Sequence, residues 1–391
     1  MQPTSLRDVR LDFFRGLAMF IIFVAHMPGN SWANFLPRAI GPSDAAEWFV
    51  FCSGFASALA FGKVFEQRGL WLGTSRILHR VWQLYWCQIA VFLTVAAMCV
   101  AGTRWLDTHD YVAKLNLTRF FAETEQGLLH LLTLTYVPNL FDILPMYMVL
   151  LLFIPVVMAL HRLRPWLALV FPPALYLAAR AFDWNLPAEW WSQRPWYFNP
   201  FTWQLLFFTG FALGRGWIHR PPFTAPWLAL AAAIMLVLFP LNFAPIWTNV
   251  EWIGAISDAH LWMINKTDFG PARYVHVLAM AFLGLALVDR FPEALRWRGF
   301  EPIVKVGQQT LPVFLSTLAL SWGAGMFLDV VGRTPLHWAM ANLAGFALMI
   351  AVAHITGFYK SQPWRRPRHK LEEGRAETPR PSAAAPAVGG D

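Results

Sequence analysis

The sequence predicts an all-α membrane protein that crosses the bilayer about ten times and has both termini in the cytoplasm. Of its 391 residues, 57% are hydrophobic and only 14% are charged, which is too apolar a composition for a soluble enzyme. About ten apolar runs have the length of a transmembrane helix. Basic residues are dense in every second connection between these runs, which is the pattern that sets membrane orientation.

The apolar runs define the predicted helices in chain order. They cover residues 9–27, 44–62, 77–101, 142–160, 165–181, 198–214, 224–242, 272–289, 303–323 and 335–358. The fifth and sixth runs are the shortest. A further stretch, residues 128–137, is too short to span a bilayer, and we expect it to be re-entrant or interfacial. The first run lacks a small-x-small cleavage site, so it is predicted to be retained as a helix.

The basic residues fix the predicted orientation. With the N-terminus in the cytoplasm, most of the 31 Lys and Arg residues lie inside, so their excess over 23 Asp and Glu reflects topology and requires no nucleic acid. Residues 1–360 then form a transmembrane domain, and residues 361–391 a basic and then disordered cytoplasmic tail. The three cysteines lie in apolar runs without disulfide or metal spacing, so no metal is expected.

The first predicted helix carries three ionisable residues, Asp12, Arg15 and His26, inside an apolar run. Charge inside a bilayer is costly and usually functional. Arg15 and His26 are eleven residues apart, which places them on one helix face, roughly 16 Å apart along the axis. Asp12 falls near the same stripe. The alternative is an intrahelical pair between Asp12 and Arg15, with His26 at the membrane interface.

Glu47 stands in the first turns of the second predicted helix and should share the depth of His26. A carboxylate beside an imidazole fixes its tautomer and raises its basicity, as in a base dyad. The alternative is an interfacial Glu that reaches toward water. At the inner end of the third helix, Arg76 and Arg80 share a face and could hold phosphates of an activated donor, or could serve the positive-inside bias alone.

Two further polar residues, Gln204 and His276, lie in apolar helices, and either could simply make a packing hydrogen bond. No GxSxG elbow, P-loop or HExxH motif is present in the sequence. Any chemistry must therefore come from the intramembrane polar stripe.

The chain resembles the OpgC family of the type 3 membrane acyltransferase superfamily. The superfamily places an Arg, ten residues and a His in the first helix, as in Arg15 and His26, and then an acidic residue before a Phe-rich run to Ser-Gly-Phe. Glu47 begins that run here, with Glu in place of the commoner Asp. Closer matches to OpgC are RLDFFRG, the His-x-Pro-Gly-Asn ending at Asn30, AEWFVFCSG, NPFTWQLLF and KTDFGPARYVHVLA. The superfamily's Arg-x-x-Arg is not matched, because Arg76 and Arg80 are one residue further apart.

The resemblance implies a multi-pass O-acyltransferase of the bacterial inner membrane. It would move an acyl group, succinyl by the family's example, from cytoplasmic acyl-CoA to hydroxyls of osmoregulated periplasmic glucans. Acyl-CoA is then a co-substrate and no cofactor stays bound. Expected partners are the acyl-CoA donor, the glucan acceptor, membrane lipids and other glucan-biosynthesis proteins. The expected site residues are His26 as general base, Glu47 as its orienter, Arg15 on the donor arm, Arg76 and Arg80 on the donor, and His276, Gln204, Arg273 and Asp12 on the acceptor or acyl group.

The rival interpretation is a solute or proton-coupled transporter that uses the same charged stripe as a pathway. Many transporters are built from internal repeats. The two halves of this sequence show no clear repeat, which counts against a transporter.

Overall fold

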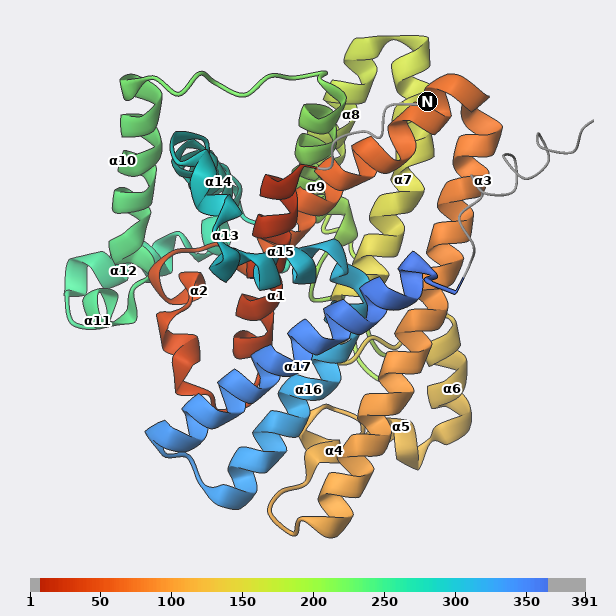
Figure 1. Ribbon diagram of the computed structural model, residues 1–391, viewed down its shortest axis with the longest axis vertical. Coiled ribbons are helices and arrows are strands. Elements are labelled where there is room, and N and C mark those ends of the chain that lie inside the picture. Colours follow the sequence, from red (N-terminus) through yellow and green to blue (C-terminus); the bar gives the residue numbers. More distant parts are fainter. Residues whose placement is uncertain (1–7, 365–391) are drawn as a thin grey trace, which may run out of the picture.

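The computed structural model describes residues 8–364, and it shows a bundle of helices (Figure 1). The described residues contain no β-strand, only an isolated bridge between Pro187 and Pro195. This confirms the all-α class. The predicted disordered tail falls almost entirely on residues 365–391, which lie outside the described residues.

The long helices carry most of the chain. They are α1 (Val9–His26), α3 (Ala45–Trp105), α7 (Ile143–Leu163), α8 (Pro165–Ala181), α9 (Pro200–Arg215), α10 (Ala225–Asn242), α14 (Pro271–Arg290), α16 (Thr310–Val331) and α17 (Pro335–Ser361). The short helices lie in the connections: η1 (Ser31–Phe35), α2 (Pro37–Ile40), α4 (Tyr111–Lys114), α5 (Thr118–Ala122), α6 (Thr124–Leu132), α11 (Ala244–Trp247), α12 (Glu251–Ala259), α13 (Leu261–Ile264), η2 (Pro292–Arg296), η3 (Arg298–Phe300) and α15 (Glu301–Gln308).

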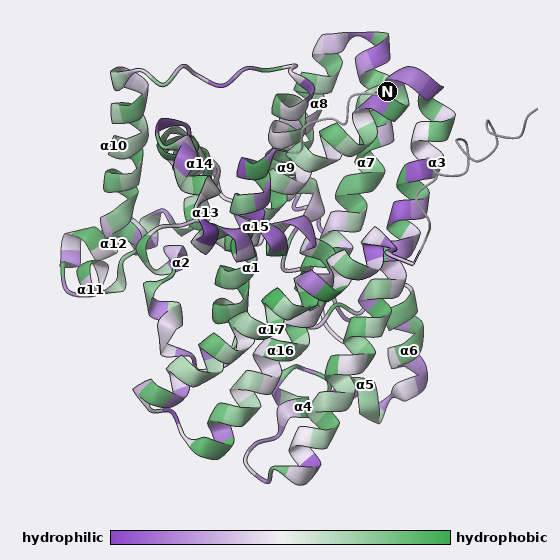
Figure 2. Ribbon diagram, in the orientation of Figure 1, coloured by the Kyte–Doolittle hydropathy of each residue, from purple (hydrophilic) through white to green (hydrophobic). Residues whose placement is uncertain are grey.

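Six of the described helices are long and apolar enough to cross a membrane: α3, α7, α10, α14, α16 and α17. Helix α1 has 18 residues but includes Arg10, Asp12 and Arg15. Helices α8 and α9 have 17 and 16 residues, in agreement with their being the shortest predicted runs. Figure 2 shows hydrophobic residues along the long helices and hydrophilic residues gathered at bends and connections. The chain is therefore a membrane protein by length and composition, and ten spans remain a prediction.

The second and third predicted helices belong to one element, α3, which bends at Gly69. Gly69 has φ 86° and ψ 174°, a conformation that residues with a Cβ rarely adopt. Figure 1 shows the two arms of α3 running in opposite directions on either side of this bend. The backbone is therefore helical on both sides of Gly69 and kinked at it, so the second and third predicted helices remain two helical arms.

The ninth predicted helix, residues 303–323, is two helices in the structure, because it is divided at Gln309 into α15 and α16. Gln309 has φ −118° and ψ 39°, which is not helical backbone. Helix α16 then continues to Val331, eight residues beyond the predicted end at residue 323. The stretch 128–137 is split between the end of α6 and an irregular segment.

Two glycine contacts bring the site-bearing helices against their neighbours. A Cβ on Gly16 of α1 would lie 1.9 Å from the Ile303 carbonyl oxygen of α15. A Cβ on Gly54 of α3 would lie 1.9 Å from the Phe207 carbonyl oxygen of α9. Small residues let helix backbones approach closely in membranes, where apolar burial gives little driving force. These contacts fix α1 and the first arm of α3, which carry the polar residues.

Candidate active site

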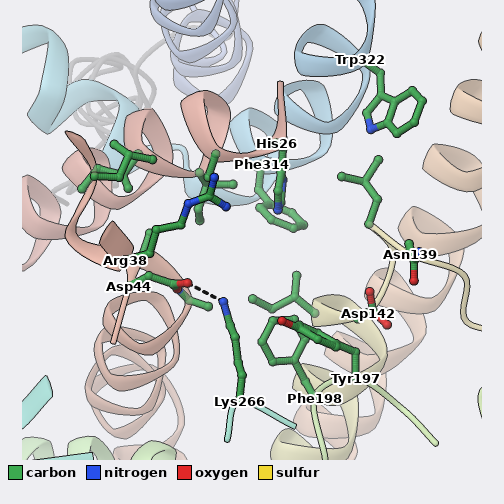
Figure 3. Close-up of a pocket in the computed structure, with 18 of the residues that line it drawn as sticks. His26, Arg38, Asp44, Asn139, Asp142, Tyr197, Phe198, Lys266, Phe314 and Trp322 are labelled. Atoms are coloured by element: carbon green, nitrogen blue, oxygen red, sulfur yellow. Dashed lines mark hydrogen bonds and ion pairs between the residues drawn. The ribbon is translucent and has the colours of Figure 1, made fainter. Parts of the chain in front are cut away.

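A cavity of about 490 Å³, lined by both apolar and ionisable side chains, lies at the C-terminal end of α1. Its ionisable lining residues come from separate parts of the chain, as Figure 3 shows. His26 ends α1, Asp44 precedes α3, Asp142 precedes α7, and Lys266 lies in the connection between α13 and α14. The remaining lining includes Arg38, Lys114, Asn139, Tyr197, Phe198, Phe314 and Trp322.

His26 is held at the cavity by the turn that ends α1. Gly29 has φ 68°, and Asn30 then caps η1 by accepting a hydrogen bond from the Trp32 backbone N–H at 3.2 Å. The Asn30 side chain also exchanges hydrogen bonds of 2.9 and 3.1 Å with Asn342 of α17. The His-x-Pro-Gly-Asn motif therefore fixes the helix end. The Nδ1 atom of His26 is buried and has no hydrogen-bond partner among the described residues.

Asp44 and Lys266 form an ion pair on one side of the cavity (Figure 3). Asp44 also caps α3 by accepting a hydrogen bond from the Ala46 backbone N–H at 2.8 Å. Burial alone would raise the pKa of Asp44, but the Lys266 ammonium and the hydrogen bonds to Asp44 hold that pKa below its usual value. Burial alone would lower the pKa of Lys266, but Asp44 keeps it above its usual value. Both groups are therefore charged at neutral pH.

Glu47 does not make the predicted hydrogen bond to His26. One Glu47 oxygen, Oε1, accepts a hydrogen bond from Arg273 Nη1 at 2.7 Å. The other, Oε2, accepts one from the Asp44 backbone N–H at 2.8 Å and completes a capping box at the start of α3. Both oxygens of Glu47 are therefore used in other bonds, and Glu47 does not line the cavity. The carboxyl groups that line it together with His26 are those of Asp44 and Asp142.

Two more predicted site residues, both on α14, contact residues next to the cavity but do not line it. His276 Nδ1 lies 2.5 Å from the hydroxyl of Ser43, the residue that precedes Asp44 in the chain. Arg273 bonds Glu47 and, through Nε, the Ile264 carbonyl oxygen at 2.5 Å. Neither residue lines the cavity. Their contacts instead hold the segment 43–47, so they act on the cavity through Asp44.

Gln204 lies away from this group, in a buried contact between α8 and α9. Its Nε2 donates a hydrogen bond to the Pro172 carbonyl oxygen at 2.7 Å. This contact matches the packing alternative considered for Gln204 from the sequence.

Asp12 and Arg15 lie near the opposite end of α1. Asp12 is buried where α1 crosses α15. Arg15 Nε is buried without a hydrogen-bond partner among the described residues, and its charge acts on the thiol of Cys52. Cys52 lines a second cavity, of about 390 Å³, whose walls are largely aromatic and aliphatic side chains of α1, α3 and α14. The structure thus separates Arg15 from His26, as the helical rise predicts.

The second cavity has charged residues only at its exposed margin. Arg10 and Arg220 line it beside His219, and both arginines pair with Asp289, at 2.7 and 3.7 Å. Arg76 and Arg80 line neither cavity. Arg76 lies 5.6 Å from the centre of the Phe61 ring, and Arg80 donates a hydrogen bond to Gln83 at 3.1 Å.

The sequence interpretation gave no site role to several of the cavity residues, among them Asp44, Asp142 and Arg38. Asp44 and Asp142 each stand directly before an apolar run, which is a helix-start signal that could have singled them out. Lys266 and Arg38 lie in connections, where sequence gives no indication of what they face. The described part of the chain contains no group of three His, Cys, Asp or Glu residues placed to hold a metal ion.

Comparison with known proteins gives one match. The profile of a family described as OpgC protein matches residues 7–361, nearly the whole chain. Searches of curated proteins and of solved structures gave no match. The matched range includes every element that lines either cavity.

Proposed function

Because the chain belongs to the OpgC family, we propose that it transfers an acyl group, succinyl in the first instance, from cytoplasmic acyl-CoA to hydroxyls of periplasmic glucans. The family implies a glucan-modifying membrane acyltransferase. The observation that carries the proposal is the buried, unpartnered Nδ1 of His26 in the cavity at the end of α1. A histidine nitrogen free of other bonds can take a proton from a sugar hydroxyl.

The proposal includes an orientation in the bacterial inner membrane. The N-terminus and α17 end on the cytoplasmic side, and the two arms of α3 count as separate spans, which gives ten. The His26 cavity then faces the periplasm, and the cavity at Cys52 faces the cytoplasm. The bias of basic residues supports this orientation. Reporter fusions at residues 255 and 368 test it, since we expect the first outside and the second inside.

The reaction needs no group beyond the two substrates. His26 accepts the proton of a glucan hydroxyl while that oxygen bonds to the acyl carbon of the thioester. The carbon–sulfur bond then breaks, and the proton held by His26 neutralises the departing CoA thiolate. The products are an ester of the glucan and free CoA. The Asp44–Lys266 pair sets the field around the imidazole, since both charges interact with His26.

The second cavity suits the donor. Its apolar walls accommodate the flexible arm of acyl-CoA, and the guanidinium groups of Arg10 and Arg220 at its exposed margin match phosphate geometry. Both arginines are held by Asp289, so phosphate would compete for cations that are already positioned. The charge of Arg15 acts on Cys52 in this cavity, which supports a contact between Arg15 and the acyl-CoA arm. A donor role for Arg76 and Arg80 remains a prediction.

The decisive experiment adds labelled acyl-CoA and unmodified glucan to the purified protein in liposomes. Label transferred to the glucan supports the acyltransferase. Movement of solute or protons across the membrane without transfer would support a transporter instead. Mass spectrometry of periplasmic glucans from cells with and without the protein then identifies the acyl group.

A further inference from the structure

Asp142 stands at the start of α7 but does not cap it. An Asp in this position usually accepts a hydrogen bond from an N–H of the first helical turn, but the side chain of Asp142 accepts none. The residue is only 6% exposed, and its Oδ1 atom is buried without a hydrogen-bond partner among the described residues. A buried polar oxygen without a partner is costly, so its retention points to a ligand.

Asp142 and His26, each with one unpartnered polar atom, line the same cavity. Figure 3 shows the Asp142 carboxyl group and the His26 ring on different sides of one space, with Asn139 and Tyr197 beside Asp142. The cavity, about 490 Å³, is within the range that holds a small ligand or a sugar unit. A ligand with hydroxyl groups on neighbouring carbons can hydrogen-bond to both side chains, because each hydroxyl donates and accepts.

The charges around the cavity favour a neutral polyol on the Asp142 side. Lys266 is committed to Asp44, and Lys114 lies 3.7 Å from Asp329. Burial raises the pKa of Asp142 to about 7, against the opposing effect of Arg194. A carboxyl group that is partly protonated at neutral pH can accept a hydrogen bond from one hydroxyl and donate one to another.

We propose that Asp142 binds the acceptor glucan by a sugar hydroxyl next to the one that His26 deprotonates. This inference rests on the proposed function, and it assigns the acceptor to the α7 side of the cavity. Asp142 is then a substrate-binding residue that selects which hydroxyl meets His26. Asn139 and Tyr197 complete the polar edge of this sugar subsite.

Binding measured without the donor separates this proposal from the proposed function. Fluorescently labelled glucan, isolated from cells that lack the protein, is titrated with purified protein in nanodiscs, and anisotropy gives the affinity. We expect Asp142→Ala to bind the glucan about tenfold more weakly than wild type, the effect of one lost hydrogen bond to a charged or buried group. Asp142→Asn keeps an acceptor and a donor, so it should lose threefold or less, roughly.

Asp110→Ala is the matched control, because Asp110 also precedes a helix but does cap it, through the Ala113 N–H at 2.9 Å. We expect wild-type affinity from this variant. Equal glucan affinity in wild type and Asp142→Ala would overturn the proposal, as would a wild type that does not bind the glucan. A fall in turnover with unchanged glucan affinity would also overturn it, because Asp142 would then act on His26. A wild type that binds glucan through Asp142 but transfers no acyl group would refute the proposed function alone.

Discussion

The two cavities at opposite ends of α1 differ in where their charges lie. The His26 cavity is lined by buried or half-buried ionisable groups, among them Asp142, Asp44 and the imidazole itself. The Cys52 cavity has aromatic and aliphatic walls, and its charged residues are exposed at the margin. Burying charge within a membrane protein is costly, so charge is kept where it is used. Under the proposed function, this difference fits proton transfer in the first cavity and binding of the flexible acyl-CoA arm in the second.

The largest effect should follow from removing the base. We expect His26→Ala to lower turnover roughly 10²–10⁴-fold, which is typical for the loss of a general base. His337→Ala is the control, because His337 is half-buried and lines neither cavity, and it bonds the Gly332 carbonyl oxygen and Thr334 at its own helix start. Activity is measured per folded, monodisperse molecule. Near-wild-type turnover in His26→Ala would remove the distinction between the cavities.

The next effect concerns stability at the His26 cavity. Lys266→Ala leaves Asp44 buried without its cation, and the two side chains are only 20% and 16% exposed. We expect a loss of about 3 kcal/mol in the free energy of unfolding at neutral pH. Lys114→Ala is the control, since Lys114 lines the same cavity but is 37% exposed and lies 3.7 Å from its carboxylate, so about 1 kcal/mol or less is expected.

The same pair predicts a pH dependence. The pKa of Asp44 is lower in the folded protein than its ordinary value, so the pair's contribution is present above pH ~4 and is lost as the pH falls through the folded pKa. The pKa of Lys266 is raised, so the contribution is also lost as the pH rises past about 10. The difference in melting temperature between wild type and Lys266→Ala should therefore be greatest near neutral pH and shrink in acid. A difference in melting temperature that does not change with pH would show that the charges of Asp44 and Lys266 do not cause it.

A further prediction concerns the Cys52 cavity. Replacing Arg10 and Arg220 together with Ala should raise the KM for acyl-CoA roughly tenfold and leave the KM for glucan unchanged, since each guanidinium makes charge-assisted bonds to phosphate. The matched double variant replaces Arg76 and Arg80, which line neither cavity. The structure predicts less than about a twofold change there. The reverse pattern would restore the assignment made from the sequence.

The smallest effect tests how Glu47 acts. Glu47→Gln keeps the acceptor for the Asp44 N–H but weakens the bond to Arg273, so we expect roughly a fivefold loss of turnover. A base dyad predicts that adding this change to His26→Ala costs little more. The contacts in the structure predict that the two losses multiply, because Glu47 has no bond to His26. A radiolabelled assay of the double variant decides between them.

Much of the fold followed from apolar runs, because a membrane requires long stretches without charge. Each predicted run is mainly helical in the structure. A kink at Gly69 lies between the second and third runs, and Gln309 divides the ninth run into two helices. The motif within one helix gave the placement of Arg15 and His26 along α1, and their site roles stay predictions. The pair expected across helices, Glu47 with His26, is not formed, because Glu47 bonds Arg273 and depth in the membrane does not fix the rotation of a helix about its axis.

The sequence by itself determined the membrane class, the polar stripe of α1 and the helix-ending turn that presents His26, since these depend on local composition and spacing. Only the tertiary structure decided which charges meet. Asp44, Asp142 and Lys266 come from segments separated by up to about two hundred residues. They converge because α7 and α14 pack against α3, which itself packs against α1. A long-range ion pair forms only where packing brings its two members within a few ångströms, and packing depends on contacts such as those of Gly16 and Gly54 rather than on the charges themselves.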